Sequence, residues 1–243
     1  MKIDKAAHYD ALAARRDMFR RRHGYYYAQL EKQYCFFIPD GKRVLEVGCS
    51  TGSLLNNLKP SYGVGVDISG RSIDEARRKF PHLTFVHGEV DALRERSEQA
   101  PFDYIVLSGL LGELDDVQDF FFKLRKFCTR DTRIVIEYHS LFWHYILELS
   151  ERLGLKMPDG IQNWLTAQDI ENFLTLAGFE AVKTSRSTLL PIYIPFVSDL
   201  INRFMARLPV FNALTLDHFI IARPVFGPRD AMSVTLLVTC RNE

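Results

Sequence analysis

A glycine-framed turn and a nearby carboxylate are the part of this sequence best suited to bind a small ligand. Gly48 and Gly52 enclose Cys-Ser-Thr directly after the apolar run at 44–47. Glycine at both positions lets the backbone turn sharply and lie against a ligand, because no Cβ atom stands in the way. Asp67 ends the next apolar run, and a carboxylate there can accept both hydroxyls of a ribose. These features together predict a nucleoside-binding site.

The middle of the turn bears on which nucleotide would bind. Dinucleotide enzymes carry Gly-x-Gly-x-x-Gly, whose second glycine lets a pyrophosphate approach the backbone. Ser50 occupies that place here, which favours a nucleoside without pyrophosphate and disfavours a dinucleotide oxidoreductase. A Walker loop is excluded, since no Gly-Lys-Ser or Gly-Lys-Thr follows. The simpler alternative is a glycine turn that only joins a strand to a helix.

The segments that must position this turn alternate between two patterns: short β-branched runs, which predict strands, and amphipathic stretches, which predict helices. The predicted strands are 43–47, 63–67, 83–86, 104–107, 133–137, 179–183 and 218–222, and the helices between the first five are about 52–59, 70–80, 90–98 and 115–128. Strands that are apolar on both faces predict a doubly wound α/β fold, whose mostly parallel, seven-stranded sheet carries helices on both faces. Ligands of such sheets bind beyond the carboxyl ends of the strands.

Composition and the positions of glycine and proline divide the chain into three predicted segments. These are an N-terminal helical lid at 1–40, broken near His23 and Gly24, the sheet domain at 41–225, and a linker with a further strand at 226–243. Apolar residues at helical spacing over 196–208 predict an inserted cap helix. Its apolar face is expected to pack on the sheet, and the alternative is that this face meets a lipid or a membrane surface.

The turn at 44–52 resembles the first motif of the class I, Rossmann-like S-adenosylmethionine-dependent methyltransferases. The resemblance continues through 67–69, 86–91, 102–111, 164–170 and 177–180, and so covers roughly 40–190. It implies a methyltransferase with S-adenosylmethionine as cofactor and S-adenosylhomocysteine as product. The resemblance implies that Glu46 orients the turn or reaches the methionyl ammonium through water, and that Asp67 binds the ribose hydroxyls. The other implied cofactor contacts are Gly48, Cys49 and Gly52 along the methionine and ribose, Ile68, Glu89 and Val90 around the adenine, and Ser108 and Gly109 at the methionine end.

The sequence gives weaker signals for the residues that would bind and activate the methyl acceptor. An oxygen or nitrogen acceptor can need a general base, and the candidates after strand ends are Glu113, His139 and His144. Many small-molecule members of the family carry Glu-His where this chain has Gly112 and Glu113, so the resemblance assigns no histidine base there. Each candidate has a purely structural role as its alternative. The run 25–27, three tyrosines, is expected to pack under the lid or to touch the cofactor.

Net charge and cysteine content limit the kinds of partner and the cellular compartment that we expect. The net charge is +1, from 31 basic and 30 acidic residues, so no nucleic-acid partner is expected. The four cysteines are scattered without a Cys-x-x-Cys pair, so no metal site is predicted and reduced thiols in the cytoplasm are expected. No signal peptide and no apolar run long enough to span a bilayer is found.

The last residues point to a different kind of domain. Residues 232–243 resemble the first strand and Asn-Glu turn of family 2 glycosyltransferases, with an ordinary terminal strand as the alternative. We therefore expect a glycosyltransferase domain fused beyond this chain, with membrane association through that missing region. The expected acceptor is a small molecule, and this association favours a saccharide or a lipid-linked compound. The alternative function is a non-catalytic methyltransferase-like module that accompanies a glycosyltransferase.

Overall fold

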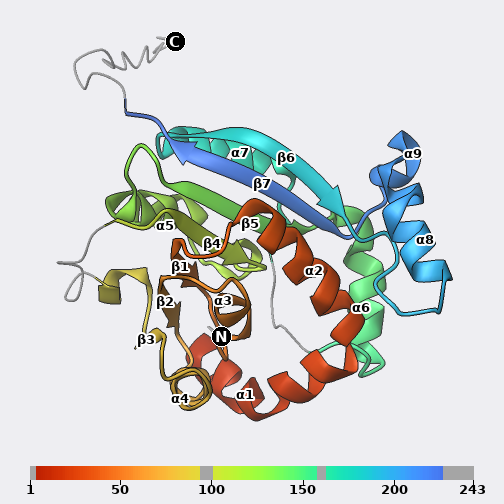
Figure 1. The fold of residues 1–243 in the computed structure, drawn as a ribbon, viewed down its shortest axis with the longest axis horizontal. Helices are drawn as coiled ribbons and strands as arrows, with labels where there is room; N and C mark the ends of the chain where they lie inside the picture. Colours follow the sequence, from red (N-terminus) through yellow and green to blue (C-terminus); the bar gives the residue numbers. More distant parts are fainter. Residues whose placement is uncertain (1–3, 94–100, 158–162, 227–243) are drawn as a thin grey trace, which may run out of the picture.

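The computed structural model describes residues 4–93, 101–157 and 163–226, and its centre is one seven-stranded sheet (Figure 1). The strands are β1 (Arg43–Val47), β2 (Tyr62–Asp67), β3 (Thr84–His87), β4 (Tyr104–Ser108), β5 (Arg133–His139), β6 (Phe179–Ser187) and β7 (Asp217–Pro224). Their order is β3-β2-β1-β4-β5-β7-β6, in which only β7 runs antiparallel to both of its neighbours. The predicted mostly parallel α/β sheet is confirmed.

Helices cover both faces of the sheet. They are α1 (Lys5–Arg22), α2 (Gly24–Phe37), α3 (Ser53–Asn57), α4 (Gly70–Lys79), α5 (Val117–Leu124), α6 (His144–Arg152), α7 (Ala167–Leu176), α8 (Val197–Arg203) and α9 (Pro209–Asn212). Short 3-10 turns add η1 (Val90–Leu93), η2 (Leu111–Glu113), η3 (Arg125–Phe127), η4 (Leu141–Trp143) and η5 (Met205–Arg207). Buried side chains of α5 and α7 pack on one face, and those of α2, α3 and α4 pack on the other. This arrangement explains why the central strands are apolar on both sides.

Local signals in the sequence fix several helix ends. The side chain of Ser69 accepts a hydrogen bond from the backbone N–H of Ser72 at the start of α4, and Asp116 does the same for Asp119 in α5. Thr166 and Asp169 form a reciprocal capping box at the start of α7. Gly178 follows α7 with a φ of +76°, the conformation that lets a glycine end a helix.

The predicted lid consists of two helices that are held in different ways. The chain breaks at His23, as the sequence predicts. Helix α2 belongs to the core, because Tyr34 is fully buried and its ring lies edge-on to Phe219, with 5.4 Å between the ring centroids. Helix α1 reaches from α4 toward the end of α6 (Figure 1). It buries Leu12 and Phe19, and polar contacts join Asp10 to Ser69 and Arg22 to the backbone of Gly154.

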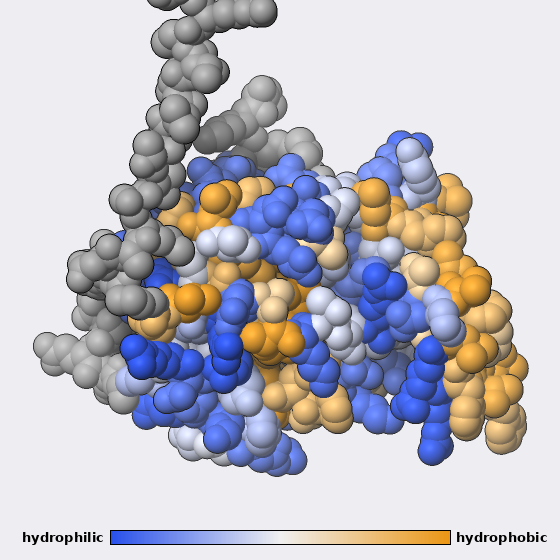
Figure 2. Space-filling model, turned by 90° about the horizontal axis from the view of Figure 1, so that it is seen from above, coloured by the Kyte–Doolittle hydropathy of each residue, from blue (hydrophilic) through white to orange (hydrophobic). Residues whose placement is uncertain are grey.

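The expectation that the cap helix over 196–208 packs its apolar face on the sheet is wrong. Helix α8 ends at Arg203, and Phe196, Leu200 and Phe204 are 91%, 58% and 59% exposed. The polar face points inward instead, because Asn202 bonds the backbone of Leu189 and Leu190. Figure 2 shows the resulting hydrophobic flank on the side where α8 and α9 lie in Figure 1.

Within the described ranges, no helix is long and apolar enough to cross a membrane. The predicted linker and terminal strand at 226–243 lie outside those ranges, except for Phe226. The predicted helix at 90–98 begins as the 3-10 turn η1, and its remainder also lies outside the described residues.

Candidate functional site

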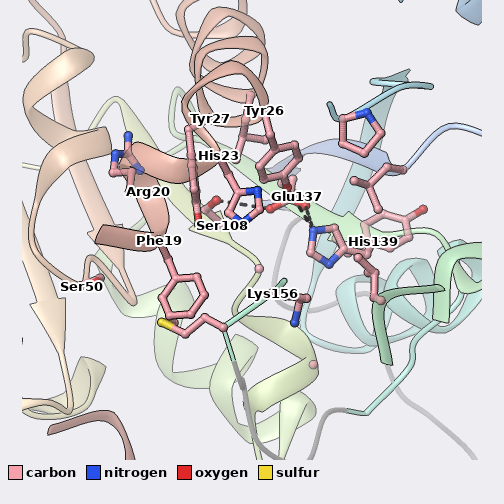
Figure 3. A pocket seen from close by; sticks show the side chains of 18 of the residues that line it. Phe19, Arg20, His23, Tyr26, Tyr27, Ser50, Ser108, Glu137, His139 and Lys156 are labelled. Atoms are coloured by element: carbon pink, nitrogen blue, oxygen red, sulfur yellow. Dashed lines mark hydrogen bonds and ion pairs between the residues drawn. The ribbon is translucent and has the colours of Figure 1, made fainter. Parts of the chain in front are cut away.

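A cavity of about 490 Å³ opens at the carboxyl ends of β1, β4 and β5, beneath the two lid helices (Figure 3). That volume is in the range of small-molecule sites. The lid contributes Arg16, Phe19, Arg20, His23, Tyr26 and Tyr27, the strand ends contribute Glu46, Gly48, Cys49, Ser108, Gly109, Glu137 and His139, and later segments contribute Trp143, Ile146, Lys156, Trp164 and Ile192. The cavity therefore lies at the edge of the sheet where the sequence predicts that a ligand binds.

The glycine turn after β1 has the backbone shape that its sequence predicts. Gly48 and Gly52 have φ angles of +77° and +76°, which favour glycine. The backbone N–H groups of Gly48 and Cys49 donate to the carbonyl of Val66, at 2.8 and 3.0 Å. Gly48 and Cys49 line the cavity. A Cβ atom on Gly52 would lie 2.6 Å from the ring of Phe85, so close packing also demands this glycine.

Glu46 lines the cavity with a carboxyl group that is only partly hydrogen-bonded, since the Leu55 backbone donates to it but one oxygen has no partner among the described residues. Its side chain is 3% exposed, and Oε2 has no hydrogen-bond partner among the described residues. Burial raises the pKa of Glu46 to about 8, while the nearby Arg20 guanidinium acts in the opposite direction. A buried carboxyl oxygen without a hydrogen-bond partner is costly unless a ligand supplies one. An ammonium group, such as the one on a methionyl moiety, fits this position.

Asp67 lies beside the cavity rather than on its wall. Its two oxygens accept the backbone N–H groups of Ser50 and Ser69, at 2.7 and 2.8 Å. The carboxylate thereby fastens the β1 turn to the end of β2, although each oxygen keeps a lone pair for a ribose hydroxyl. Helix α1 lies next to this position, because the Ser69 hydroxyl donates to Asp10 at 2.7 Å. The ribose-binding role of Asp67 stays a prediction.

The other predicted cofactor residues fall into two groups. Ser108 and Gly109 line the cavity at the end of β4, as expected for the methionine end. Ile68, Glu89 and Val90 lie at the ends of β2 and β3, outside the cavity wall. Val90 is only 3% exposed and belongs to the core, whereas Glu89 is exposed. Their adenine contacts remain predictions.

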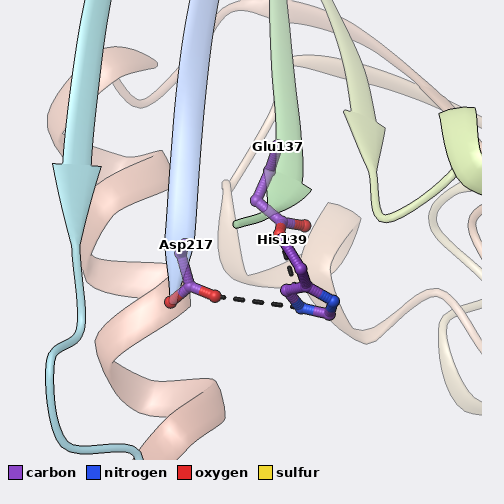
Figure 4. Close-up of side chains that lie close together, drawn as sticks. All are labelled: Glu137, His139 and Asp217. Atoms are coloured by element: carbon purple, nitrogen blue, oxygen red, sulfur yellow. Dashed lines mark ion pairs between the residues drawn. The ribbon is translucent and has the colours of Figure 1, made fainter. Parts of the chain in front are cut away.

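A polar cluster forms the far end of the cavity, where β5 meets β7 (Figure 4). The Nε2 atom of His139 lies 3.7 Å from Oε1 of Glu137 and 3.9 Å from Oδ1 of Asp217. The hydroxyl of Tyr26 donates to Asp217 at 3.0 Å and lies 3.2 Å from His139 Nε2. Ser108 donates to Glu137 at 3.3 Å. Burial raises the pKa of both carboxyl groups, and their mutual proximity adds to the effect at Glu137.

The three predicted base candidates occupy different surroundings. His139 lines the cavity within the polar cluster, and Glu113 also lines the cavity, on the turn η2. His144 is not on the cavity wall, because its ring packs edge-on against Trp164 with 4.5 Å between centroids. The structure therefore groups His139 with charged partners and gives His144 a packing role.

Glu137 and Asp217 were not predicted as site residues. Glu137 follows four residues of a mostly apolar strand, near its end, and a carboxylate in such a run is a signal that could have identified it. Asp217 carries no such signal, because its position depends on β7 pairing antiparallel with β5. Tyr26 lies in the predicted tyrosine run, and its hydroxyl reaches the polar cluster as well as packing under the lid.

Comparisons with known proteins found a matching family model and solved structures that share the fold. A family model described as a methyltransferase domain matches residues 18–184. A solved S-adenosylmethionine-dependent methyltransferase of Thermotoga maritima, described as a possible histamine N-methyltransferase, superposes with a TM-score of 0.67 at 13% identity, over 89% of this chain and 98% of that one. Magnesium protoporphyrin IX methyltransferase of Synechocystis, solved with bound S-adenosylhomocysteine, gives 0.61 at 16% identity, over 92% and 100%. No curated protein matches the sequence.

Proposed function

The chain belongs to the methyltransferase-domain family that matches residues 18–184, and we propose that it methylates a small acceptor enclosed in the cavity. The family match and the shared fold support S-adenosylmethionine as the cofactor. S-adenosylmethionine would supply an electrophilic methyl group, so the protein's task is to hold the acceptor in line with it and to exclude water.

The observation that carries the proposal is that one cavity joins the buried carboxyl of Glu46, whose Oε2 has no partner among the described residues, to the polar cluster at Glu137 and His139. In this proposal Glu46 would bind the ammonium of the cofactor, and Gly48 and Cys49 would let the backbone approach it. Ser108 and Gly109 lie between the two ends of the cavity wall. The lid helices cover the space, and Tyr26 ties α2 to the acceptor's end.

We propose that the acceptor is a saccharide or a lipid-linked compound. The polar cluster suits a hydroxyl-bearing head group. Ile146 and Ile192 line the cavity and are 43% and 56% exposed, so its apolar wall continues onto the surface. That surface leads to the hydrophobic flank near α8 (Figure 2), which suits an acyl or prenyl chain and contact with a membrane.

Calorimetry with S-adenosylhomocysteine tests the cofactor's half of the proposal. We expect one site per chain, and binding about 10-fold weaker in Glu46→Gln, which loses a charge-assisted contact. Glu113→Gln is the matched control, since this carboxylate also lines the cavity but carries no proposed cofactor contact. Absence of binding to the unaltered chain would contradict the proposal. Transfer of a radiolabelled methyl group into saccharide or lipid fractions then tests the acceptor.

A further inference from the structure

We propose that Glu137, His139 and Asp217 bind one divalent transition-metal ion. The inference rests on the proposed function, because it assigns the acceptor's end of the same cavity and names the acceptor's chemistry. The sequence does not predict this site, because it has no Cys-x-x-Cys pair and Asp217 lies far from the other two residues along the chain. Strand pairing brings them together.

The backbone preorganises the three side chains. His139 and Asp217 are direct cross-strand partners in the antiparallel ladder of β5 and β7. Glu137 precedes His139 by two positions on β5, so both side chains project from the same face of the sheet. A ligand set built on paired strands is held more rigidly than one built on loops.

The distances between the three ligand atoms suit a single metal ion if the side chains move slightly closer together. One ligand atom from each residue lies within 4.8 Å of the other two, and His139 Nε2 is 3.7 and 3.9 Å from the two carboxylates. Bonds of about 2.1 Å in tetrahedral or octahedral geometry place neighbouring ligand atoms roughly 3.0–3.4 Å apart. Side-chain rotations that move these atoms inward by less than about 1 Å would close most of the difference.

Unpaired buried oxygens favour a cation at this cluster. Glu137 and Asp217 are 2% and 0% exposed, and Oε1 of Glu137 and Oδ2 of Asp217 have no hydrogen-bond partner among the described residues. Neither carboxylate forms an ion pair with a described lysine or arginine. Burying two neighbouring carboxylates without a cation is costly, and a divalent ion offsets that cost for both.

Tyr26 would support the ligand set from outside. Its hydroxyl donates to Oδ1 of Asp217, which orients this carboxylate as an outer partner orients a metal ligand. The same hydroxyl lies 3.2 Å from His139 Nε2, and the ion would replace it as the neighbour of that nitrogen.

The donor set selects the kind of ion and the kind of acceptor. One imidazole and two carboxylates suit Mn²⁺, Fe²⁺, Co²⁺ or Zn²⁺ better than Mg²⁺ or Ca²⁺, which prefer oxygen alone. Glu137 and His139 line the cavity and Asp217 lies behind them, so the open coordination positions would face the acceptor. An ion there binds a hydroxyl oxygen and lowers its pKa, so the assigned acceptor class is a hydroxyl-bearing molecule.

Cobalt titration of the EDTA-treated full chain tests the site. We expect a visible absorption band that saturates at one Co²⁺ per chain, and its displacement by Zn²⁺. His139→Ala and Glu137→Gln should each weaken binding at least about 10-fold. His144→Ala is the matched control, because this histidine lies on the neighbouring helix α6 and outside the cluster. Circular dichroism and thermal melts establish that each variant is folded.

Two outcomes would overturn the metal site: absence of stoichiometric binding of Co²⁺ and Zn²⁺, or unchanged binding in folded His139→Ala. Calorimetry with S-adenosylhomocysteine on the metal-free chain separates this failure from failure of the proposed function. If the chain binds S-adenosylhomocysteine but no metal ion, only the metal site is wrong. If it binds the metal ion but not S-adenosylhomocysteine, the methyltransferase proposal is wrong.

Discussion

The hydroxyl of Tyr26 on helix α2 donates a 3.0 Å hydrogen bond to Asp217, the first residue of β7. This bond joins the N-terminal lid to the far edge of the cavity, where β5 and β7 meet. Helix α2 is therefore fixed to this end of the cavity, whereas the polar contacts of Asp10 on α1 are made to the loop after β2 and the start of α4.

Tyr26→Phe should lower the free energy of unfolding by about 0.5–1.5 kcal/mol, because the fully buried carboxyl of Asp217 loses one hydroxyl donor and keeps Thr188. Urea denaturation measures the change. Tyr145→Phe is the control: Tyr145 is 78% exposed, so its loss should cost less than about 0.5 kcal/mol. Equal effects of the two substitutions would show that the bond to Asp217 contributes nothing.

Glu46 should make the unliganded protein less stable as pH rises. Its folded pKa is about 8, above the ordinary value of 4.5, so the folded state holds this proton more tightly than the unfolded state. Stability from this group is complete at low pH and is lost as pH rises through about 8, by a few kcal/mol at most. Denaturation of Glu46→Gln between pH 5 and 9 should show a correspondingly flatter profile. A profile parallel to that of the unaltered chain would contradict the prediction.

Gly52→Ala should destabilise the fold by about 2–4 kcal/mol, since the new Cβ atom meets the Phe85 ring and φ is +76°. Gly41→Ala is the matched control, because Gly41 has a φ of +77° but no heavy atom lies within 4 Å of the position that a Cβ would occupy. The control should cost only about 1 kcal/mol, from backbone strain. The difference in denaturation midpoint isolates the packing contribution.

Asp10→Ala should loosen α1 over the end of β2. Asp10 accepts hydrogen bonds from the Ser69 hydroxyl and the Arg71 backbone, at 2.7 and 3.0 Å. Hydrogen exchange in α1 should accelerate several-fold, and S-adenosylhomocysteine should slow it again if the helix closes over the cofactor. Asp74→Ala supplies the control, since its side chain is 78% exposed and its pair with Arg77 stays within α4. Unchanged exchange in α1 would show that Asp10 does not hold the helix.

The sequence predicts the sheet and the cofactor turn because both depend on local patterns. The apolar runs and the glycines at 48 and 52 can each be interpreted from a few neighbouring residues. The polar cluster was only partly predictable, since the proximity of Glu137 to Asp217 requires the insertion of β7 between β5 and β6. Helical periodicity at 196–208 found amphipathic structure but could not tell which face turns inward, because Asn202 and Ser198 anchor that segment through the backbone.

Because the polar face of α8 points inward, different residues stabilise this segment and form its outer surface. Asn202 and Ser198 hold it in place, so the exposed rings of Phe196 and Phe204 add little to folding. Lysine at these two positions should therefore be tolerated, unlike any polar replacement at a core phenylalanine such as Phe121. Natural selection can then vary the outer side chains freely, according to whatever they meet, without endangering the fold beneath them.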